Sequence, residues 1–238
     1  MISLNLKDFG LEPRIIRGRV VGRKLVPYHT RSEIDQGALE GQGLELAWVD
    51  PVEAFFLHIQ GSGRVLFPDG RQLLVNYADQ NGRPYVSLGR VMIERGLLAR
   101  DGLSMQKLKQ YLFDHPDEVQ ELLTTNPSYV FFRVVEAGPL GCLGVPLTPG
   151  RSLALDRRIF PDAALGFIRT QKPVVDQGQI AGWQDFSRLV LFQDTGGAIK
   201  GPGRADLFFG HGPEAELGAG HMKKTGRLAV LVHRSVVK

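Results

Sequence analysis

The chain has 238 residues, of which 43% are hydrophobic and 23% are charged, and its formal net charge is +4. This length and hydrophobic content can supply a core for one large domain or two smaller ones, which excludes a disordered chain. No run of about 18 apolar residues occurs, which excludes a helix that crosses a bilayer, and the mild positive charge would suit an anionic polymer such as a nucleic acid or a cell-wall glycan.

The first part of the chain predicts a mixture of helices and strands. Thr30 and Glu33 have the spacing of a capping box, which predicts a short helix to about Leu39. Residues 44–67 have strand-like composition in three segments, LELAWV, AFFLHIQ and RVLF. His58 lies in the second segment, where its apolar neighbours favour an outward-facing strand residue over a ligand.

A hairpin and a group of helices are predicted next. The sequence Pro68-Asp69-Gly70 is typical of a hairpin turn, and residues 72–77 have the composition of the returning strand. Met105, Leu108 and Leu112 recur at helical spacing, so we expect them to face a core. The helices are expected at residues 87–96, 104–113 and 116–123, followed by a strand at 128–135.

From about residue 137 the composition changes to short strands separated by Gly and Pro. This pattern predicts an all-β region, apart from a helical turn at about residues 162–165. Cys142 is the single cysteine, so it cannot form an internal disulfide. Its neighbours Gly141 and Leu143 indicate a small buried thiol rather than a nucleophile.

Two carboxylates near the C-terminus are the strongest candidates for chemistry. Asp194 lies one residue after the apolar segment 189–192, and Asp206 directly precedes the apolar segment 207–209. A Gly-rich connection separates them. Each Asp therefore lies where a buried strand is expected to meet a loop, a place that can hold a side chain rigidly and still expose it to substrate.

This pair of aspartates leaves three chemistries open. Asp194-Thr195-Gly196 matches the tripeptide of aspartic proteases, but this chain holds one copy, so a protease would have to be a dimer. Two carboxylates in a groove would also suit a glycosidase. A single carboxylic acid would suffice for a transglycosylase that closes an anhydro-sugar, because the substrate then supplies its own nucleophile.

Cofactor sites are not indicated. His211 and His221 have no further ligand at metal spacing, so we expect no metal. Residues 61–63 lack the remaining positions of a dinucleotide fingerprint, and residues 196–201 lack the end of a phosphate-binding loop. We expect both Gly-rich segments to bring the backbone close to a ligand or to another strand.

Short motifs along the whole chain have an order and spacing that is specific when taken together. They are TRSEI (30–34), FFLHIQGSG (55–63), Tyr77 with Asn81-Gly82 and Tyr85, SMQ (104–106), NPSYVFF (126–132), VPLT (145–148), DRR (156–158), DTGGAIKG (194–201) and RADLFFG (204–210). On these motifs the chain resembles the membrane-bound lytic murein transglycosylase A (MltA) family.

The resemblance implies a mainly β protein with some helix, organised as two domains. Residues 1–136 would form a smaller, β-rich insert domain with helices. Residues 137–238 would form the 3D domain, a six-stranded double-psi β-barrel named for three aspartates, with the substrate groove between the two domains. The three family aspartates map onto Asp156, Asp194 and Asp206, with Asp206 as the catalytic acid and base and the other two in support.

The implied reaction cleaves the β-1,4 bond between N-acetylmuramic acid and N-acetylglucosamine. Asp206 would protonate the leaving oxygen, which requires a protonated carboxyl favoured by Leu207, Phe208 and a nearby Asp194. Its carboxylate would then take the proton of the muramic acid 6-hydroxyl as that oxygen closes a 1,6-anhydro ring. No water is consumed and no cofactor is needed.

Substrate contacts are expected from polar and aromatic residues in the same motifs. These candidates are Gln60, Gly61, Ser62, Gly63, Asn81, Tyr85 and Lys200. The partner would be the glycan strands of peptidoglycan and not a nucleic acid, with a cell-wall synthesis complex as a further partner.

The resemblance implies a place in the cell envelope, on the periplasmic side of the outer membrane. Family members are typically held there by a lipid anchor. They begin with a lipoprotein signal and a segment containing Gly-Tyr-Tyr and Pro, neither of which occurs here, so we expect the barrel to lack its N-terminal contribution. Two rivals remain beside the transglycosylase: a catalytically silent glycan-binding wall protein and a dimeric aspartic protease.

Overall fold

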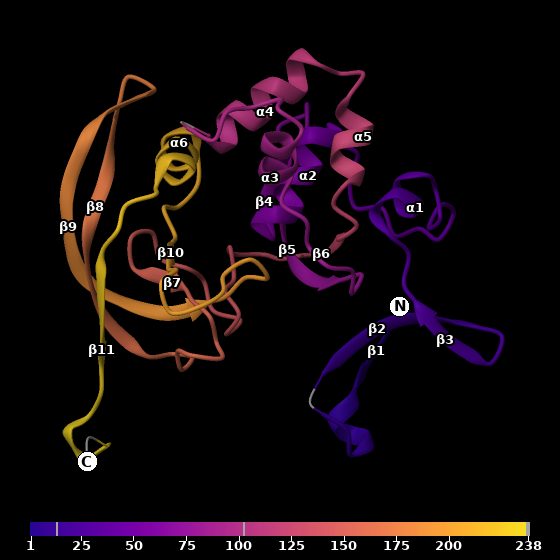
Figure 1. The fold of residues 1–238 in the computed structure, drawn as a ribbon, viewed down its shortest axis with the longest axis horizontal. Helices are drawn as coiled ribbons and strands as arrows, with labels where there is room; N and C mark the ends of the chain where they lie inside the picture. The colour runs from indigo at the N-terminus through magenta and orange to yellow at the C-terminus, as the bar shows by residue number, and fades with distance from the viewer. Residues whose placement is uncertain (13, 102, 237–238) are drawn as a thin grey trace. The chain divides into compact units, whose positions relative to one another are not determined.

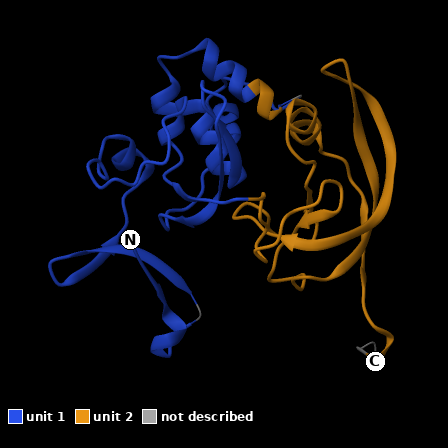
Figure 2. Ribbon diagram, turned by 180° about the vertical axis from the view of Figure 1, so that it is seen from behind, with its two compact units in different colours: residues 1–103, 108–136 blue, residues 104–107, 137–238 orange. Residues whose placement is uncertain are grey.

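The computed structural model describes residues 1–12, 14–101 and 103–236, and it is mainly β with several short helices (Figure 1). The chain divides into two compact units, coloured separately in Figure 2. The first unit comprises residues 1–103 and 108–136, and the second comprises residues 104–107 and 137–238.

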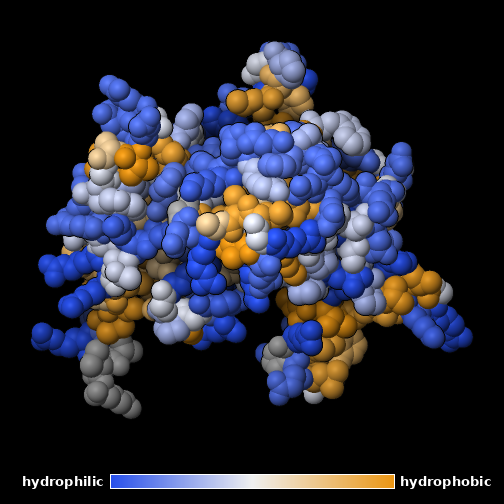
Figure 3. Space-filling view, turned by 45° about the horizontal axis from the view of Figure 1, so that its top comes forward, coloured by the Kyte–Doolittle hydropathy of each residue, from blue (hydrophilic) through white to orange (hydrophobic). Residues whose placement is uncertain are grey.

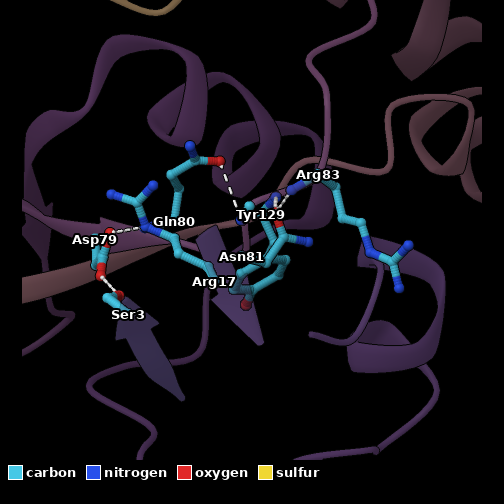
Figure 4. Close-up of polar contacts among 8 residues, drawn as sticks. Ser3, Arg17, Asp79, Gln80, Asn81, Arg83 and Tyr129 are labelled. Carbon is cyan, nitrogen blue, oxygen red and sulfur yellow. Dashed lines mark hydrogen bonds and ion pairs between the residues drawn. The ribbon is translucent and has the colours of Figure 1, made fainter. Parts of the chain in front are cut away.

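The first unit begins with an antiparallel sheet that the sequence analysis did not anticipate. Its strands are β1 (Ile2–Asn5), β2 (Ile15–Val21) and β3 (Lys24–Pro27), and a 3₁₀ helix, η1 (Leu6–Phe9), follows β1. Asp79 joins this sheet to the next one, because its carboxylate accepts hydrogen bonds from Arg17 Nε at 2.6 Å and Ser3 Oγ at 3.2 Å (Figure 4). Arg17 and Asp79 are partly buried, which favours this pair over a fully solvated one.

The helix predicted after Thr30 is confirmed. In α1 (Arg31–Asp35) the Thr30 hydroxyl accepts from the Glu33 backbone N–H, and the Glu33 carboxylate accepts from the Thr30 backbone N–H at 2.7 Å. The helix ends earlier than expected. A capping box fixes where a helix begins but not where it stops.

The prediction of strands in residues 44–60 is wrong. AFFLHIQ lies in the helix α2 (Pro51–Gln60), and LELAWV has no regular structure and leaves Trp48 89% exposed. The helix starts because the Asp50 carboxylate accepts the N–H groups of Val52 and Glu53, while Pro51 occupies the first turn, where it needs no N–H partner. Phe55 and Phe56 therefore face the core as helical neighbours rather than as strand residues.

The hairpin predicted around Gly70 is confirmed. Strand β4 (Ser62–Leu66) pairs with β5 (Gln72–Gln80), and β6 (Val130–Val134) completes an antiparallel sheet with the order β4-β5-β6. Gly70 has a φ of 85°, a left-handed conformation that glycine adopts without a steric penalty.

The three predicted helices are also present, as α3 (Leu88–Glu94), α4 (Met105–Asp114) and α5 (Val119–Thr124). Ser87 caps α3 by accepting the Arg90 N–H. Of the predicted stripe on α4, Leu112 is completely buried, while Met105 and Leu108 are half-buried. The buried apolar side chains of this unit's helices and sheet are Val52, Phe55, Phe56, Val75, Leu88, Met92, Leu112, Leu122 and Leu123.

The second unit is built on a five-stranded sheet with the order β10-β7-β9-β8-β11. Its strands are β7 (Ser152–Ala154), β8 (Leu165–Asp176), β9 (Gln179–Asp194), β10 (Asp206–Leu207) and β11 (Arg227–Leu231). Only the β7–β9 pair is parallel within this sheet. The sheets of the described residues are not closed into a barrel, so the expected six-stranded double-psi barrel is not confirmed. The core of the sheet consists of Leu153, Leu155, Ile168, Phe186, Val190 and Phe192.

The prediction of an all-β second region is also wrong in one element. Helix α6 (Pro213–His221) packs against β8 and β9, with Gly218 close to the Phe209 ring and Pro173. Pro213 in the first turn and the acidic residues Glu214 and Glu216 behind it favour a helix start at this point. Residues 162–163 instead form a turn, and Leu165 already begins β8. A short 3₁₀ helix, η2 (Arg234–Val236), follows β11.

Hydrophobic side chains reach the surface in several separate patches among hydrophilic ones (Figure 3). The most exposed, apart from Trp48, are Leu66 at 67% and Phe9 at 65%. No helix in residues 1–12, 14–101 or 103–236 is both long and apolar enough to cross a membrane.

Candidate active site

Asp194 and Asp206 lie on the two strands that flank β7. In the registers of the sheet, Asp194 of β9 and Asp206 of β10 are both paired with Ala154. Residues that are paired across neighbouring strands point to the same face of a sheet, and strands are about 4.8 Å apart. The two aspartates therefore share one face, with their backbones about 10 Å apart across the small side chain of Ala154.

Asp206 is the more accessible of the two. Its side chain is 45% exposed, and Arg204 donates to it from Nε at 3.0 Å and from Nη2 at 2.9 Å. Arg204 also donates from Nη1 to the Ala198 carbonyl, which holds the guanidinium against the loop between β9 and β10. Arg204 occupies both carboxylate oxygens, so this pair has to open before Asp206 can contact a substrate.

Asp194 is half-buried at the end of β9. Burial raises the pKa of its carboxyl, although hydrogen bonds from the backbone of Thr195 and Cys142 oppose that rise. The sequence predicted a buried, unreactive thiol at Cys142, and the structure leaves that side chain half-buried, with burial raising the pKa of the thiol. A raised pKa lowers the thiolate fraction, which is consistent with an unreactive cysteine.

Asp156 lies two residues beyond β7 and is only 2% exposed. Its carboxylate accepts four hydrogen bonds: three come from Arg158, through Nε, Nη2 and the backbone N–H, and one comes from the Gly201 N–H at 2.8 Å. The Arg158 side chain and the Gly201 N–H hold the pKa of this carboxyl well below its usual range. A carboxylate held in this way is unsuited to exchange protons at neutral pH.

The loop of residues 195–205 is fastened to the end of β7 at two points. Asp156 holds Gly201, and the Thr195 hydroxyl donates to the Leu155 carbonyl at 2.9 Å. Ile199 is buried, and Lys200 beside it is exposed. The loop that carries Lys200 therefore belongs to the same edge of the sheet as Asp194 and Asp206.

The second group of predicted site residues lies in the first unit. Gln60 ends α2, Gly61 follows in a left-handed conformation with a φ of 75°, and Ser62 and Gly63 begin β4. A side chain at Gly63 would have its Cβ 2.4 Å from Leu57 Cδ1. Gly63 thus allows the close contact of helix and strand, Gly61 ends the helix, and Gln60 is exposed at the end of the helix.

Asn81 is completely buried and cannot contact a sugar as the sequence predicted. Its amide nitrogen donates to the carbonyls of His29 and Pro127, each at 2.8 Å, and its oxygen accepts from the N–H groups of Arg83 and Tyr129. Figure 4 shows Asn81 between Arg83 and Tyr129. Every polar position of this amide is occupied, so its role is structural.

Tyr85, in the segment after Gly82, is 42% exposed, as a sugar contact would require. His58 was predicted to face outward from a strand, and that is wrong: it is half-buried in α2, where Arg31 Nη2 lies 2.8 Å from its Nδ1. Burial and the Arg31 charge lower the pKa of His58 to about 3.

Two of the cavities in the second unit have none of Asp156, Asp194 and Asp206 in their linings. One, of about 530 Å³, is lined by residues of β8, β9 and α6, and the other, of about 690 Å³, by residues of β8, β9 and the start of β11. Among the residues that the structure describes, no three His, Cys, Asp or Glu side chains are grouped so that they could hold a metal ion.

Sequence reasoning did not assign roles to Arg204, Arg158, Ser152 or Gln193, which surround the three aspartates. Arg204 and Arg158 each lie two residues from their aspartate. At this spacing Arg204 and Asp206 share one side of an extended segment, whereas Arg158 reaches Asp156 because a turn begins at Asp156. An Arg two residues from an Asp was the available signal in both cases. Ser152 and Gln193 gave no signal, because the residue types alone do not reveal a strand register.

Two family models match the chain. The model described as the MltA specific insert domain matches residues 1–133, and the model described as the 3D domain matches residues 151–232. The chain is therefore of the class that joins an insert domain of this kind to a 3D domain.

The chain belongs to the membrane-bound lytic murein transglycosylase A (MltA) family. The protein of that name from Vibrio cholerae is 42% identical over 203 residues, which cover 84% of this chain and 54% of that protein. The protein of that name from Escherichia coli K12 is 37% identical over 205 residues, which cover 85% and 55%. The chain thus spans about half the length of the curated relatives it matches.

Solved structures give the same result. A membrane-bound lytic murein transglycosylase from Agrobacterium tumefaciens superposes with a TM-score of 0.85 at 37% identity, covering 98% of this chain and 66% of that one. The crystal structure of E. coli MltA with bound chitohexaose superposes with a TM-score of 0.73 at 35% identity, covering 90% and 64%. A mainly β fold with some helix is therefore shared with these neighbours.

Proposed function

We propose that this chain carries the catalytic part of a peptidoglycan lytic transglycosylase. It would cleave the β-1,4 bond between N-acetylmuramic acid and N-acetylglucosamine without water and leave 1,6-anhydro ends. The observation that carries the proposal is the common register of Asp194 and Asp206 across Ala154, in a chain of the MltA family.

Asp206 is proposed as the general acid and base. It is the accessible carboxylate of the pair, and the bidentate contact with Arg204 holds it in one orientation. Acting first as an acid, it protonates the glycosidic oxygen, and the bond to the anomeric carbon breaks through an oxocarbenium-like transition state. Acting next as a base, it takes the proton of the 6-hydroxyl, whose oxygen attacks the same carbon.

Asp194 supports this reaction from the neighbouring position. Its half-buried carboxylate faces the same side as Asp206, where a negative charge would stabilise the developing positive charge of the sugar. Asp156 is assigned a positioning role, because its four hydrogen bonds fasten the loop of residues 195–205 rather than exposing a carboxylate to substrate.

The proposal extends to the domains and the glycan contacts. Residues 1–136 would be the insert domain and residues 137–238 the 3D domain, with a double-psi barrel and a glycan groove as the finer form of the fold. The relative solved with bound chitohexaose supports a chitin-like glycan as the ligand class. The proposed sugar contacts are Gln60, Gly61, Ser62, Gly63, Tyr85 and Lys200.

The cellular setting is part of the proposal as well. Relatives are named as membrane-bound, which supports a place in the cell envelope, on the periplasmic side of the outer membrane. The substrate would be the glycan strands of peptidoglycan, and a cell-wall synthesis complex would be the protein partner.

A silent glycan-binding protein is the second candidate. The Arg204–Asp206 pair favours it, because the guanidinium occupies both oxygens of the carboxylate that would have to contact the glycosidic oxygen. A dimeric aspartic protease receives no such support, since the chain belongs to a transglycosylase family.

Digestion of purified murein sacculi in ¹⁸O-labelled water tests the proposal. A transglycosylase releases 1,6-anhydro-muropeptides whose new ends contain no ¹⁸O, because the closing oxygen comes from the sugar itself. Reducing ends that carry ¹⁸O would instead mean hydrolysis. Binding to sacculi without any released fragment would support the silent protein.

A further inference from the structure

The pairing of β9 with β7 is irregular directly before Asp194. We propose that a β-bulge at Gln193, held in place by Ser152, is the device that turns Asp194 toward the face of Asp206. Gln193 and Ser152 are then positioning residues of the site. This inference rests on the proposed function, because it assigns Asp194 a part in the reaction.

The register of β7 and β9 identifies the bulge. Leu153 is paired with Phe192, and the next residue, Ala154, is paired with Asp194, so Gln193 is left over. In a regular strand Asp194 would lie on the same side as Phe192, two residues earlier, and Phe192 is 3% exposed in the core of the sheet. The extra residue reverses this alternation and moves Asp194 to the side of Ala154.

A buried pair of hydrogen bonds holds the bulge. The Ser152 hydroxyl donates to Gln193 Oε1 at 2.7 Å and accepts the Thr148 N–H at 2.9 Å, and Ser152 is only 1% exposed. Because Ser152 and Ala154 are two residues apart on β7, they share a side. The Gln193 side chain is therefore anchored on the face that carries both aspartates.

The backbone of the bulge is held by a second segment. Gly141 approaches the Gln193 carbonyl so closely that a Cβ at Gly141 would lie 2.2 Å from that oxygen. The Cys142 thiol donates to the same carbonyl at 3.5 Å, and the Cys142 N–H donates to Asp194 Oδ1 at 3.2 Å. One short segment thus contacts both the bulged residue and the carboxylate that follows it.

The experiment uses two variants that remove the side-chain anchor. Gln193→Leu removes the acceptor, and Ser152→Ala removes only the hydroxyl, so it stays informative if the larger change disturbs folding. Gln184→Leu and Ser187→Ala on exposed positions of β9 are the matched controls. Each variant is assayed for release of 1,6-anhydro ends from soluble glycan strands across pH, with Tm as the measure of folding.

We expect both anchor variants to lower kcat by up to about 10²-fold with little change in KM, because a small misplacement of a catalytic group is costly. The acidic limb of the pH profile should move to lower pH as the Asp194 carboxyl loses part of its burial. Unchanged kcat and an unchanged profile in folded Gln193→Leu and Ser152→Ala would overturn the inference.

A second readout separates this inference from the proposed function. The Asp194 carboxyl carbon can be followed by ¹³C NMR titration in the unmodified chain and in Ser152→Ala. A lower midpoint in the variant supports the positioning role even if no anhydro product is released by either protein, which would be a failure of the proposed function alone. An identical midpoint contradicts the positioning role.

Discussion

The three candidate aspartates of the second unit have three different environments. Asp156 is buried beneath hydrogen bonds from Arg158 and Gly201, Asp194 is half-buried, and Asp206 is exposed beside Arg204. Their surroundings, and not their residue type, therefore separate a structural carboxylate from the two that are proposed to face a substrate.

Asp156→Asn should lower the Tm of the second unit at neutral pH. The lowered pKa of this carboxyl means that its stabilising effect is present above about pH 4 and is lost as the pH falls through the folded-state value. Thermal unfolding measured from pH 7 downward should therefore show a difference from the unmodified chain that narrows toward strong acid. An equal loss in the exposed control Asp176→Asn would contradict this explanation.

Asp194→Asn should lower activity and at the same time flatten the dependence of stability on pH. Burial raises the pKa of this carboxyl, so the folded state binds a proton more tightly than the unfolded state, and the free energy of unfolding falls as the pH rises through that window. Replacing the carboxyl removes this contribution. Thermal unfolding curves at pH 4 and pH 7 measure this contribution. If Tm changes by the same amount between the two pH values in Asp194→Asn and in the unmodified chain, the explanation is wrong.

At the scale of elements, a buried cation joins α1, α2 and the start of β6. Arg31 donates to the Asn126 and Ser128 carbonyls, contacts His58 Nδ1, and lies 4.8 Å from the centre of the Phe55 ring. His58 has to be neutral to accept from this guanidinium. The pairing therefore makes the packing of the first unit dependent on pH.

The free energy of unfolding of the first unit should fall as the pH drops from about 6.5 toward 3. In this range the unfolded chain binds a proton at His58 that the folded chain excludes, with a limiting slope of about 1.4 kcal/mol per pH unit. His58→Gln keeps an acceptor for Arg31 and should remove that slope. Urea unfolding at several pH values measures the slope, and the variant His233→Gln, at an exposed position, is the control.

Elements with a local signal were predictable from the sequence. The capping box of Thr30, the turn at Gly70 and the helix cap at Ser87 each act through their immediate neighbours. The apolar residues after Pro51 suggest a strand, but the Asp50 carboxylate caps a helix at this point. A short apolar segment does not distinguish a buried helix from a strand, so the cap was the deciding evidence.

At the scale of the whole molecule, the candidate site is predictable only in part. The aspartates were identified from their position beside apolar segments, yet their common face depends on strand pairings that join residues about 40 and 50 positions apart. Asn81 shows the reverse case, since it was expected to contact a sugar and is instead buried, where it joins His29 to residues 127–129. Long-range register and burial are therefore the information that the local sequence lacked.

The most direct test of the account is the turnover of Asp206→Asn on soluble glycan strands, measured beside its binding of a chito-oligosaccharide. General acid-base catalysis contributes about 10²- to 10⁴-fold, and Asp206 would act in both steps, so turnover should fall by at least that factor while binding is retained. The exposed control Asp185→Asn should keep both properties. Turnover near that of the unmodified chain in folded Asp206→Asn would contradict the account.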